Sequence, residues 1–290
     1  MDQYSITVFC FLASYLIALT IEGISLWKRQ VWQWPAVLFA TTAGLVAHTW
    51  YLLQRSTETK LPPLLSSTHD WFLVLAWIVV LFYLFFRVAE RSFSLGPFLL
   101  PVVLLLIGSA YYVSMSPNAL LAEELSGNYS AKRGWAMLHA ILLLFGISGV
   151  ILGFLLALMY LIQHRRLKQK PATHTELTLP NLERLARFNW WAVMLSIPLL
   201  SLGLFTGVIL GVWSKSGSDV FSFKDPVVII NGLAWGVMVV FFVWLIQAKR
   251  SAGKMVAWRT IWAFGFLLVT LIGLQLLTSG GHISLETWHT

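Results

Sequence analysis

The chain has 290 residues, of which 58% are hydrophobic and 11% charged, and it carries a formal net charge of +8. This composition excludes a soluble domain of useful size and is typical of a polytopic membrane protein. No nucleic-acid partner is expected, because that function needs a continuous basic face on a soluble surface. The one cysteine, Cys10, excludes disulfides and cysteine-ligated zinc within a single chain.

Apolar runs long enough to cross a bilayer, which needs about 20 residues, recur along the whole chain. We place eight of them near residues 5–27, 35–54, 70–89, 94–115, 134–163, 190–213, 227–247 and 258–279. The first is interpreted as a retained helix, because Asp2 stands where a signal peptide would be basic. The sequence predicts an all-α integral membrane protein of about eight transmembrane helices, in one membrane domain covering residues 1–290.

Lysine and arginine are unevenly distributed among the predicted loops. Fourteen of the twenty follow the first, third, fifth and seventh windows, and the positive-inside rule assigns these loops to the cytoplasm. Both termini are then outside a plasma (inner) membrane, whose lipid is the expected surroundings. The basic cytoplasmic loop, residues 164–189, ends in LPNLERLARFN, whose apolar and charged faces predict a helix lying on the inner membrane surface.

Three of the seven histidines are expected in the outer half of the membrane: His48 and His139 lie toward the predicted outer ends of their windows, and His282 follows the last window at the outer interface. The other four are expected to be solvated loop residues: His69, His164, His174 and His289. One intramembrane histidine is explained almost equally well by a local hydrogen bond, but three at one depth indicate a shared site. Haem needs two axial ligands and an apolar slot, which imidazoles in a membrane can provide. A closed zinc site needs four ligands, and no carboxylate lies at the depth of these histidines in the spans.

Four stretches resemble the CcsA/CcmC/CcmF family of cytochrome c assembly proteins, and most closely its HemX- and YpjD-like branch. They cover much of a core near residues 35–285 and read GWAMLHAILLLFG from residue 134, LPNLERLARFNWWAVMLSIPLLSLGLFTGVILG from 179, WSKSGSDVFSFKDPVVIINGLAW from 213 and LLTSGGHIS from 276. The most specific match is the segment Pro198 to Gly207, which is similar to a PLLTLGxxTG core of the family.

The resemblance implies that His139 and His282 are the axial ligands of a haem b at the outer face. His48 matches a histidine of the second helix in the HemX- and YpjD-like branch, and we expect it near the haem without contact to the iron. A bis-imidazole iron is coordinatively saturated, so the protein would hold or present haem.

The external loop, residues 213–226, occupies the position of the family's tryptophan-rich WWD loop. The resemblance implies that Trp213, Phe221 and Phe223 cover the porphyrin, and Lys224 is a candidate partner for a propionate. The family's key tryptophans are phenylalanines here, so the indole N–H donors are missing and we expect loosely held haem.

The expected function is cytochrome c biogenesis, in which the chain binds haem and presents or delivers it. A CcsB/ResB-like membrane subunit and apocytochrome c are the candidate partners, and we do not expect an enzyme acting by itself. Three alternatives stay open: a HemX-like membrane regulator of glutamyl-tRNA reductase levels, a scaffold with structural histidines, and a transporter.

Overall fold

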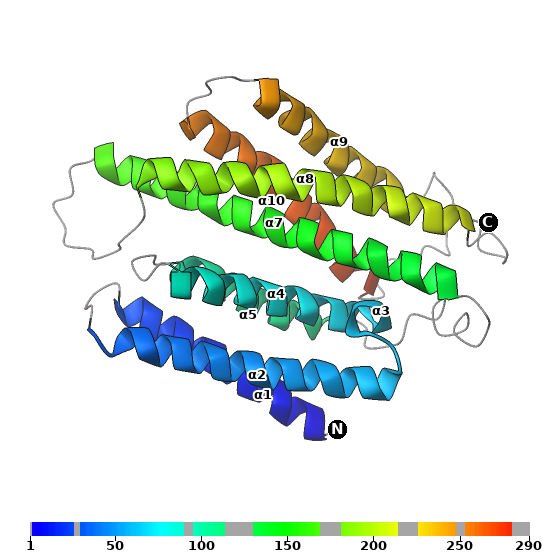
Figure 1. The fold of residues 1–290 in the computed structure, drawn as a ribbon, viewed down its shortest axis with the longest axis horizontal. Coiled ribbons are helices and arrows are strands. Elements are labelled where there is room, and N and C mark those ends of the chain that lie inside the picture. The colour runs from blue at the N-terminus through cyan, green and yellow to red at the C-terminus, as the bar shows by residue number, and fades with distance from the viewer. Residues whose placement is uncertain are drawn as a thin grey trace. The chain divides into compact units, whose positions relative to one another are not determined.

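A computed structural model describes residues 2–25, 30–89, 95–113, 130–168, 181–213, 226–247 and 253–279, and its regular elements are all helices (Figure 1). The helices are α1 (Asp2–Ser25), α2 (Gln33–Thr59), α3 (Pro63–Ser66), α4 (Thr68–Ala89), α5 (Gly96–Ala110), α7 (Ser130–Lys168), α8 (Leu182–Trp213), α9 (Pro226–Gln247) and α10 (Gly253–Ser279). Each of the eight apolar windows predicted from the sequence corresponds to one of the longer helices.

The helices fall into two compact units, with α1 to α5 in the first and α7 to α10 in the second. In the first unit, α2 packs on α1 and α4, and α5 packs on α1 and α4. In the second, α7 packs on α8 and α10, and α9 packs on α8 and α10. The single membrane domain expected from the sequence stays a prediction.

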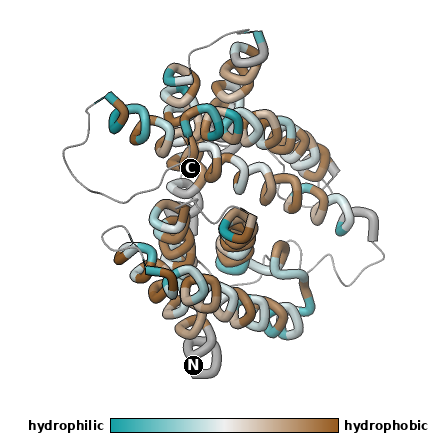
Figure 2. Tube along the Cα trace, turned by 60° about the vertical axis from the view of Figure 1, so that its left-hand side comes forward, coloured by the Kyte–Doolittle hydropathy of each residue, from teal (hydrophilic) through white to brown (hydrophobic). Residues whose placement is uncertain are grey.

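Six of the described helices are long and apolar enough to cross a membrane, which makes the protein a polytopic membrane protein. These candidate spans are Val8–Ser25, Gln33–Thr59, Thr68–Ala89, Arg133–Lys168, Leu182–Leu210 and Gly253–Leu271. The other two predicted spans correspond to α5, which has 15 residues, and to α9, in which a shorter apolar helix, Trp235–Trp244, is recognised. Figure 2 shows hydrophobic colour along most of the helical length and hydrophilic colour gathered at helix ends.

Two helices begin at side chains that satisfy free backbone N–H groups. The Ser67 hydroxyl accepts a hydrogen bond from the backbone N–H of Asp70 at 3.1 Å, which caps α4. The Asn181 carboxamide oxygen accepts one from the backbone N–H of Arg184 at 2.9 Å, which caps α8. These caps determine where α4 and α8 start, independently of the apolar runs that follow.

The segment from Leu182 to Asn189 is not the separate surface helix that the sequence predicts. It forms the first turns of α8, which continues without a break to Trp213. No glycine or proline lies between Leu182 and Pro198, so nothing in the local sequence interrupts the helix. The rest of that predicted loop divides between the end of α7 and residues 169–180, which lie outside the described part of the chain.

Glycines allow α7 and α8 to approach closely along their length. A Cβ added to Gly149 would lie 2.9 Å from the Ser196 Cβ, and one added to Gly146 would lie 2.7 Å from the Leu200 Cγ. Since the residue number falls on α7 as it rises on α8, the two helices are antiparallel. This packing places the first half of α7, from His139 to Gly146, against the segment of α8 that contains Pro198 to Gly207.

Candidate functional site

His139 lies on α7 and is held by the backbone of α8. Its Nδ1 is 2.7 Å from the carbonyl oxygen of Gly203. A carbonyl oxygen can only accept, so Nδ1 carries the proton and donates it. The Thr206 hydroxyl lies 3.4 Å from the same nitrogen and itself donates to the Gly203 carbonyl at 2.7 Å.

The segment that resembles the family core forms the seat for this imidazole. A Cβ added to Gly207 would lie 2.7 Å from the His139 Cε1 and 3.1 Å from its Nδ1, so the ring occupies space that only glycine leaves open. In the same segment, the Ser201 hydroxyl accepts a hydrogen bond from the Trp235 indole at 2.9 Å, which ties α9 to α8. We define the His139 seat as Gly203, Thr206 and Gly207.

This hydrogen bond determines which nitrogen of His139 can bind a metal. With the proton on Nδ1, the lone pair is on Nε2, the usual arrangement when a histidine ligates iron or zinc while its second nitrogen donates to a carbonyl. No described residue forms a hydrogen bond with Nε2. The side chain is half-buried, so the seat supplies an oriented imidazole whose coordinating nitrogen has no other partner in the described structure.

The other predicted haem residues of this region are not described at side-chain level. His282, Phe221, Phe223 and Lys224 lie outside the described residues, and Trp213 is the last residue of α8, where only the backbone is described. The groups that would join His139 around a porphyrin therefore stay predictions from the sequence.

His48 lies inside the first unit, between α1 and α2. Its ring stacks on Phe11 with centroids 4.2 Å apart and an interplanar angle of 6°, and its Nδ1 is 3.3 Å from the Tyr15 hydroxyl oxygen. The side chain is fully buried, and its Nε2 has no hydrogen-bond partner among the described residues. Its proposed place near a haem stays a prediction.

His69 is not the solvated loop residue that the sequence suggests. It lies in the first turn of α4 with 1% of its surface exposed. Its Nδ1 donates to the Ala110 carbonyl at 2.8 Å, and its Nε2 accepts from the Tyr51 hydroxyl at 3.4 Å. Both nitrogens are used, so this histidine joins α2, α4 and α5 and has no lone pair to offer a ligand.

Two buried ion pairs join the two ends of α4 to neighbouring helices. Counting lysine and arginine along the loops did not predict these ion pairs. In the first turn, Asp70 is fully buried and pairs with Arg55 of α2 at 3.1 Å. In the last turn, Arg87 pairs with Glu22 of α1 at 3.2 Å, and the Tyr83 hydroxyl donates to the same carboxylate oxygen at 2.8 Å. The sequence STHD at residues 67–70, a capping pattern ahead of an apolar run, is the signal that would have placed Asp70 on a helix.

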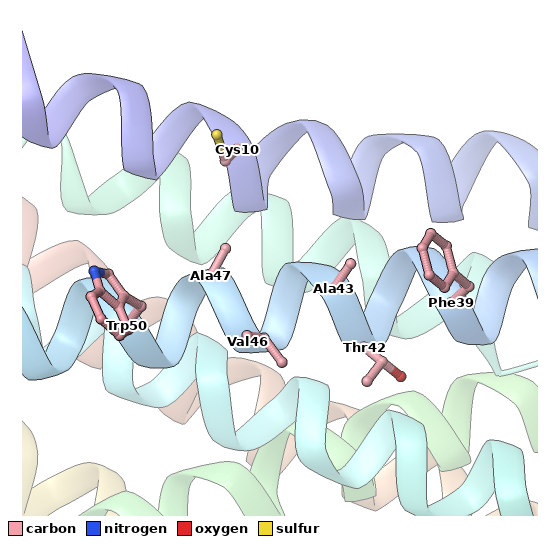
Figure 3. Close-up of a pocket in the computed structure, with 7 residues that line it drawn as sticks. All are labelled: Cys10, Phe39, Thr42, Ala43, Val46, Ala47 and Trp50. Atoms are coloured by element: carbon pink, nitrogen blue, oxygen red, sulfur yellow. The ribbon is translucent and has the colours of Figure 1, made fainter.

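A shallow apolar groove of about 570 Å³ runs along α1 and α2 (Figure 3). It is lined by Cys10, Phe39, Thr42, Ala43, Val46, Ala47 and Trp50. The one hydroxyl in it, that of Thr42, donates to the Leu38 carbonyl within its own helix. The groove therefore presents mostly hydrocarbon, and the thiol of Cys10 is the one metal-ligating group among its lining side chains.

Among the described residues, no group of three or more His, Cys, Asp or Glu side chains is placed to hold a metal ion. The six candidate membrane spans among the described helices define the class of protein, a polytopic membrane protein.

Comparison with known proteins identifies the family. Residues 65–282 match the family described as "Cytochrome C assembly protein", and the chain belongs to that family. The matched region contains α4 to α10 and so includes the His139 seat.

Individual relatives agree with this family. The chain is 28% identical over 138 residues to Protein HemX of Brevibacillus brevis, a match that covers 47% of this chain and 48% of that protein. It is 23% identical over 250 residues to the cytochrome c biogenesis protein CcsA of Trieres chinensis, covering 75% of this chain and 76% of the relative. The CcsA of Guillardia theta is 22% identical over 286 residues, 92% of each chain. No solved structure matches.

Proposed function

We propose that this protein binds haem b at the outer face of the membrane through His139 and His282 and presents it for cytochrome c assembly. The observation that carries the proposal is the seat of His139, in which Nδ1–H donates to the Gly203 carbonyl and leaves the Nε2 lone pair for iron. The family is one of cytochrome c assembly, and its segment Pro198 to Gly207 builds this seat.

Haem, when bound, would be held by the imidazoles of His139 and His282 and would supply the iron porphyrin that cytochrome c assembly requires. The chain's own task is then to orient His139, to exclude water from the ring with the helices α7 and α8, and to hold the macrocycle. From the sequence we assign the covering role to Trp213, Phe221 and Phe223, and propionate pairing to Lys224. His48, buried in the first unit, would act without touching iron, and a CcsB/ResB-like subunit would supply the transfer to apocytochrome c.

Absorbance of the purified protein tests this proposal. Wild type is expected to show a Soret band with the low-spin pattern of two imidazoles, whereas His139→Ala and His282→Ala should each give a five-coordinate iron. Added imidazole should restore part of the low-spin spectrum in both variants, because it fills the empty axial position.

His164→Ala is the matched control, since His164 lies on the same helix and stacks on Tyr160 with centroids 6.2 Å apart. It should retain the wild-type spectrum. If both single variants of the proposed ligands keep a wild-type low-spin spectrum, the ligand assignment is wrong.

The orientation follows from the distribution of lysine and arginine and needs a separate test. Reporter fusions at Lys170 and Ser216 should place residue 170 in the cytoplasm and residue 216 outside. Alkaline phosphatase is active only outside, so activity at Ser216 and none at Lys170 is the expected result. The reverse pattern would place the His139 end of α7 on the cytoplasmic side and refute the outer-face site.

A further inference from the structure

One end of the second unit gathers basic side chains from three different helices. The last turn of α7 carries Arg165, Arg166 and Lys168, the first turns of α8 carry Arg184 and Arg187, and the first turn of α10 carries Lys254. We call these six residues the basic collar. Five of them are exposed and Arg166 is half-buried.

Packing contacts bring these three helix ends to the same end of the second unit. The antiparallel pairing of α7 and α8 sets the end of α7 beside the start of α8, and a Cβ on Gly253 at the start of α10 would lie 2.6 Å from the Tyr160 hydroxyl oxygen of α7. The Asn189 carboxamide donates to the Thr260 hydroxyl at 3.3 Å, which places α8 beside α10. Both helices are antiparallel to α7, because Gly253 of α10 faces Tyr160 and Gly265 faces Phe154, so α8 and α10 run in the same direction. Figure 1 shows these three ends together at the left of the second unit.

Directly next to the collar, toward the middle of the helices, is a group of exposed tryptophans. They are Trp190 and Trp191 on α8 and Trp258 and Trp262 on α10, with exposed fractions from 40% to 72%. At 1.5 Å per residue, Arg184 lies about 10 Å along α8 from Trp191. Along α10, Lys254 and Trp258 are about one turn apart.

This order of side chains matches the layers of a phospholipid monolayer. Tryptophan rings partition to the boundary between acyl chains and headgroups, and basic side chains one or two turns farther out reach the phosphate level. All six collar residues are basic, and the acidic residue described among these turns, Glu183, pairs with Arg187 at 3.1 Å. Tryptophans beside basic side chains at helix ends are the pattern that membrane proteins show at the headgroup level, so this order favours a lipid as the occupant.

We propose that the basic collar is a binding site for phospholipids with anionic phosphodiester headgroups, which the second unit retains as bound lipids. The guanidinium and ammonium groups contact the headgroup phosphate, and the tryptophans pack against its glycerol and upper acyl chain. The proposal concerns lipid retention and does not depend on haem binding.

The test uses the full-length protein in a neutral detergent, with phosphatidylglycerol and phosphatidylcholine of identical acyl chains as probes. Native mass spectrometry should show retained phosphatidylglycerol and little phosphatidylcholine, and phosphatidylglycerol alone should raise the melting temperature. Replacing Arg165, Arg166 and Lys168 together by Gln should weaken phosphatidylglycerol binding roughly 100-fold, since each basic residue near an anionic surface contributes about a factor of five.

Arg133→Gln is the matched control, because Arg133 is exposed at the opposite end of α7. It should leave binding unchanged, and Arg165→Lys with Arg166→Lys should retain most of it. Equal binding of both lipids, or equal stabilisation by inorganic phosphate at the same concentration, would overturn the proposal. So would binding of a polyglutamate peptide in the absence of phosphatidylglycerol binding, because that result would identify an acidic protein as the partner.

Discussion

Replacing Arg55 by Met is expected to lower the free energy of unfolding by about 3–5 kcal/mol. Arg55 donates to both carboxylate oxygens of Asp70, at 3.1 Å and 3.2 Å, and Asp70 is fully buried. Removing the guanidinium leaves a carboxylate in an apolar interior with the Ser66 hydroxyl and its helix N-terminus as the remaining partners. Denaturant unfolding of the purified protein in detergent, followed by circular dichroism, measures the loss.

Two further variants separate this effect from a general loss of charge. Arg55→Met combined with Asp70→Leu removes both partners and should recover most of the stability, because an apolar pair of similar volume avoids the buried charge. Arg187→Gln breaks an exposed pair with Glu183 one turn away on the same helix and should cost less than about 0.5 kcal/mol. A small effect of Arg55→Met, similar to that of Arg187→Gln, would show that the Asp70 carboxylate is not held as the structure indicates.

The sequence was sufficient to predict the helices, because each long apolar run had to be helical to satisfy its backbone in a membrane. It was less informative about the residues at which the helices begin and about which polar side chains are buried. Leu182 to Asn189 has the amphipathic pattern of a surface helix, yet the same residues start α8, since a helix without glycine or proline simply continues. His69 was expected in a loop because it precedes the apolar window that begins at residue 70, but the cap from Ser67 and the ion pair of Asp70 begin α4 at Thr68 and include it in the helix.

The geometry of the candidate site could be predicted from the sequence even less well than the helix ends. His139 could be identified as a candidate because it is an imidazole in an apolar run, and because it matches a haem-ligand position of the family that the sequence resembles. Its hydrogen-bond acceptor is the backbone carbonyl of Gly203, 64 residues away. Every residue has a backbone carbonyl, so the sequence gives no sign of which one accepts this hydrogen bond. The glycines of the segment Pro198 to Gly207 could be noticed as a pattern, but only the packing of α7 on α8 shows that Gly207 makes room for the ring.

Gly207→Ala is expected to weaken haem binding at least about tenfold while the fold is retained. The new Cβ would lie 2.7 Å from the His139 Cε1, so the ring must move, and the 2.7 Å hydrogen bond from Nδ1 to the Gly203 carbonyl must lengthen or break. Loss of that bond costs about 1 kcal/mol, and the proton is then no longer held on Nδ1, so Nε2 is not always free to bind iron. Alanine has a better helix propensity than glycine, and this gain offsets a similar amount of the lost folding stability.

Haem titration followed at the Soret band measures the affinity, and a thermal melt of the haem-free protein measures the fold. Gly134→Ala is the matched control, because Gly134 lies on the same helix as His139 and a Cβ there meets nothing within 4 Å. It should leave haem affinity unchanged and keep or slightly raise the melting temperature. Gly207→Ala should lower haem affinity with little change in melting temperature. Wild-type haem affinity in that variant would show that His139 does not ligate iron from this seat.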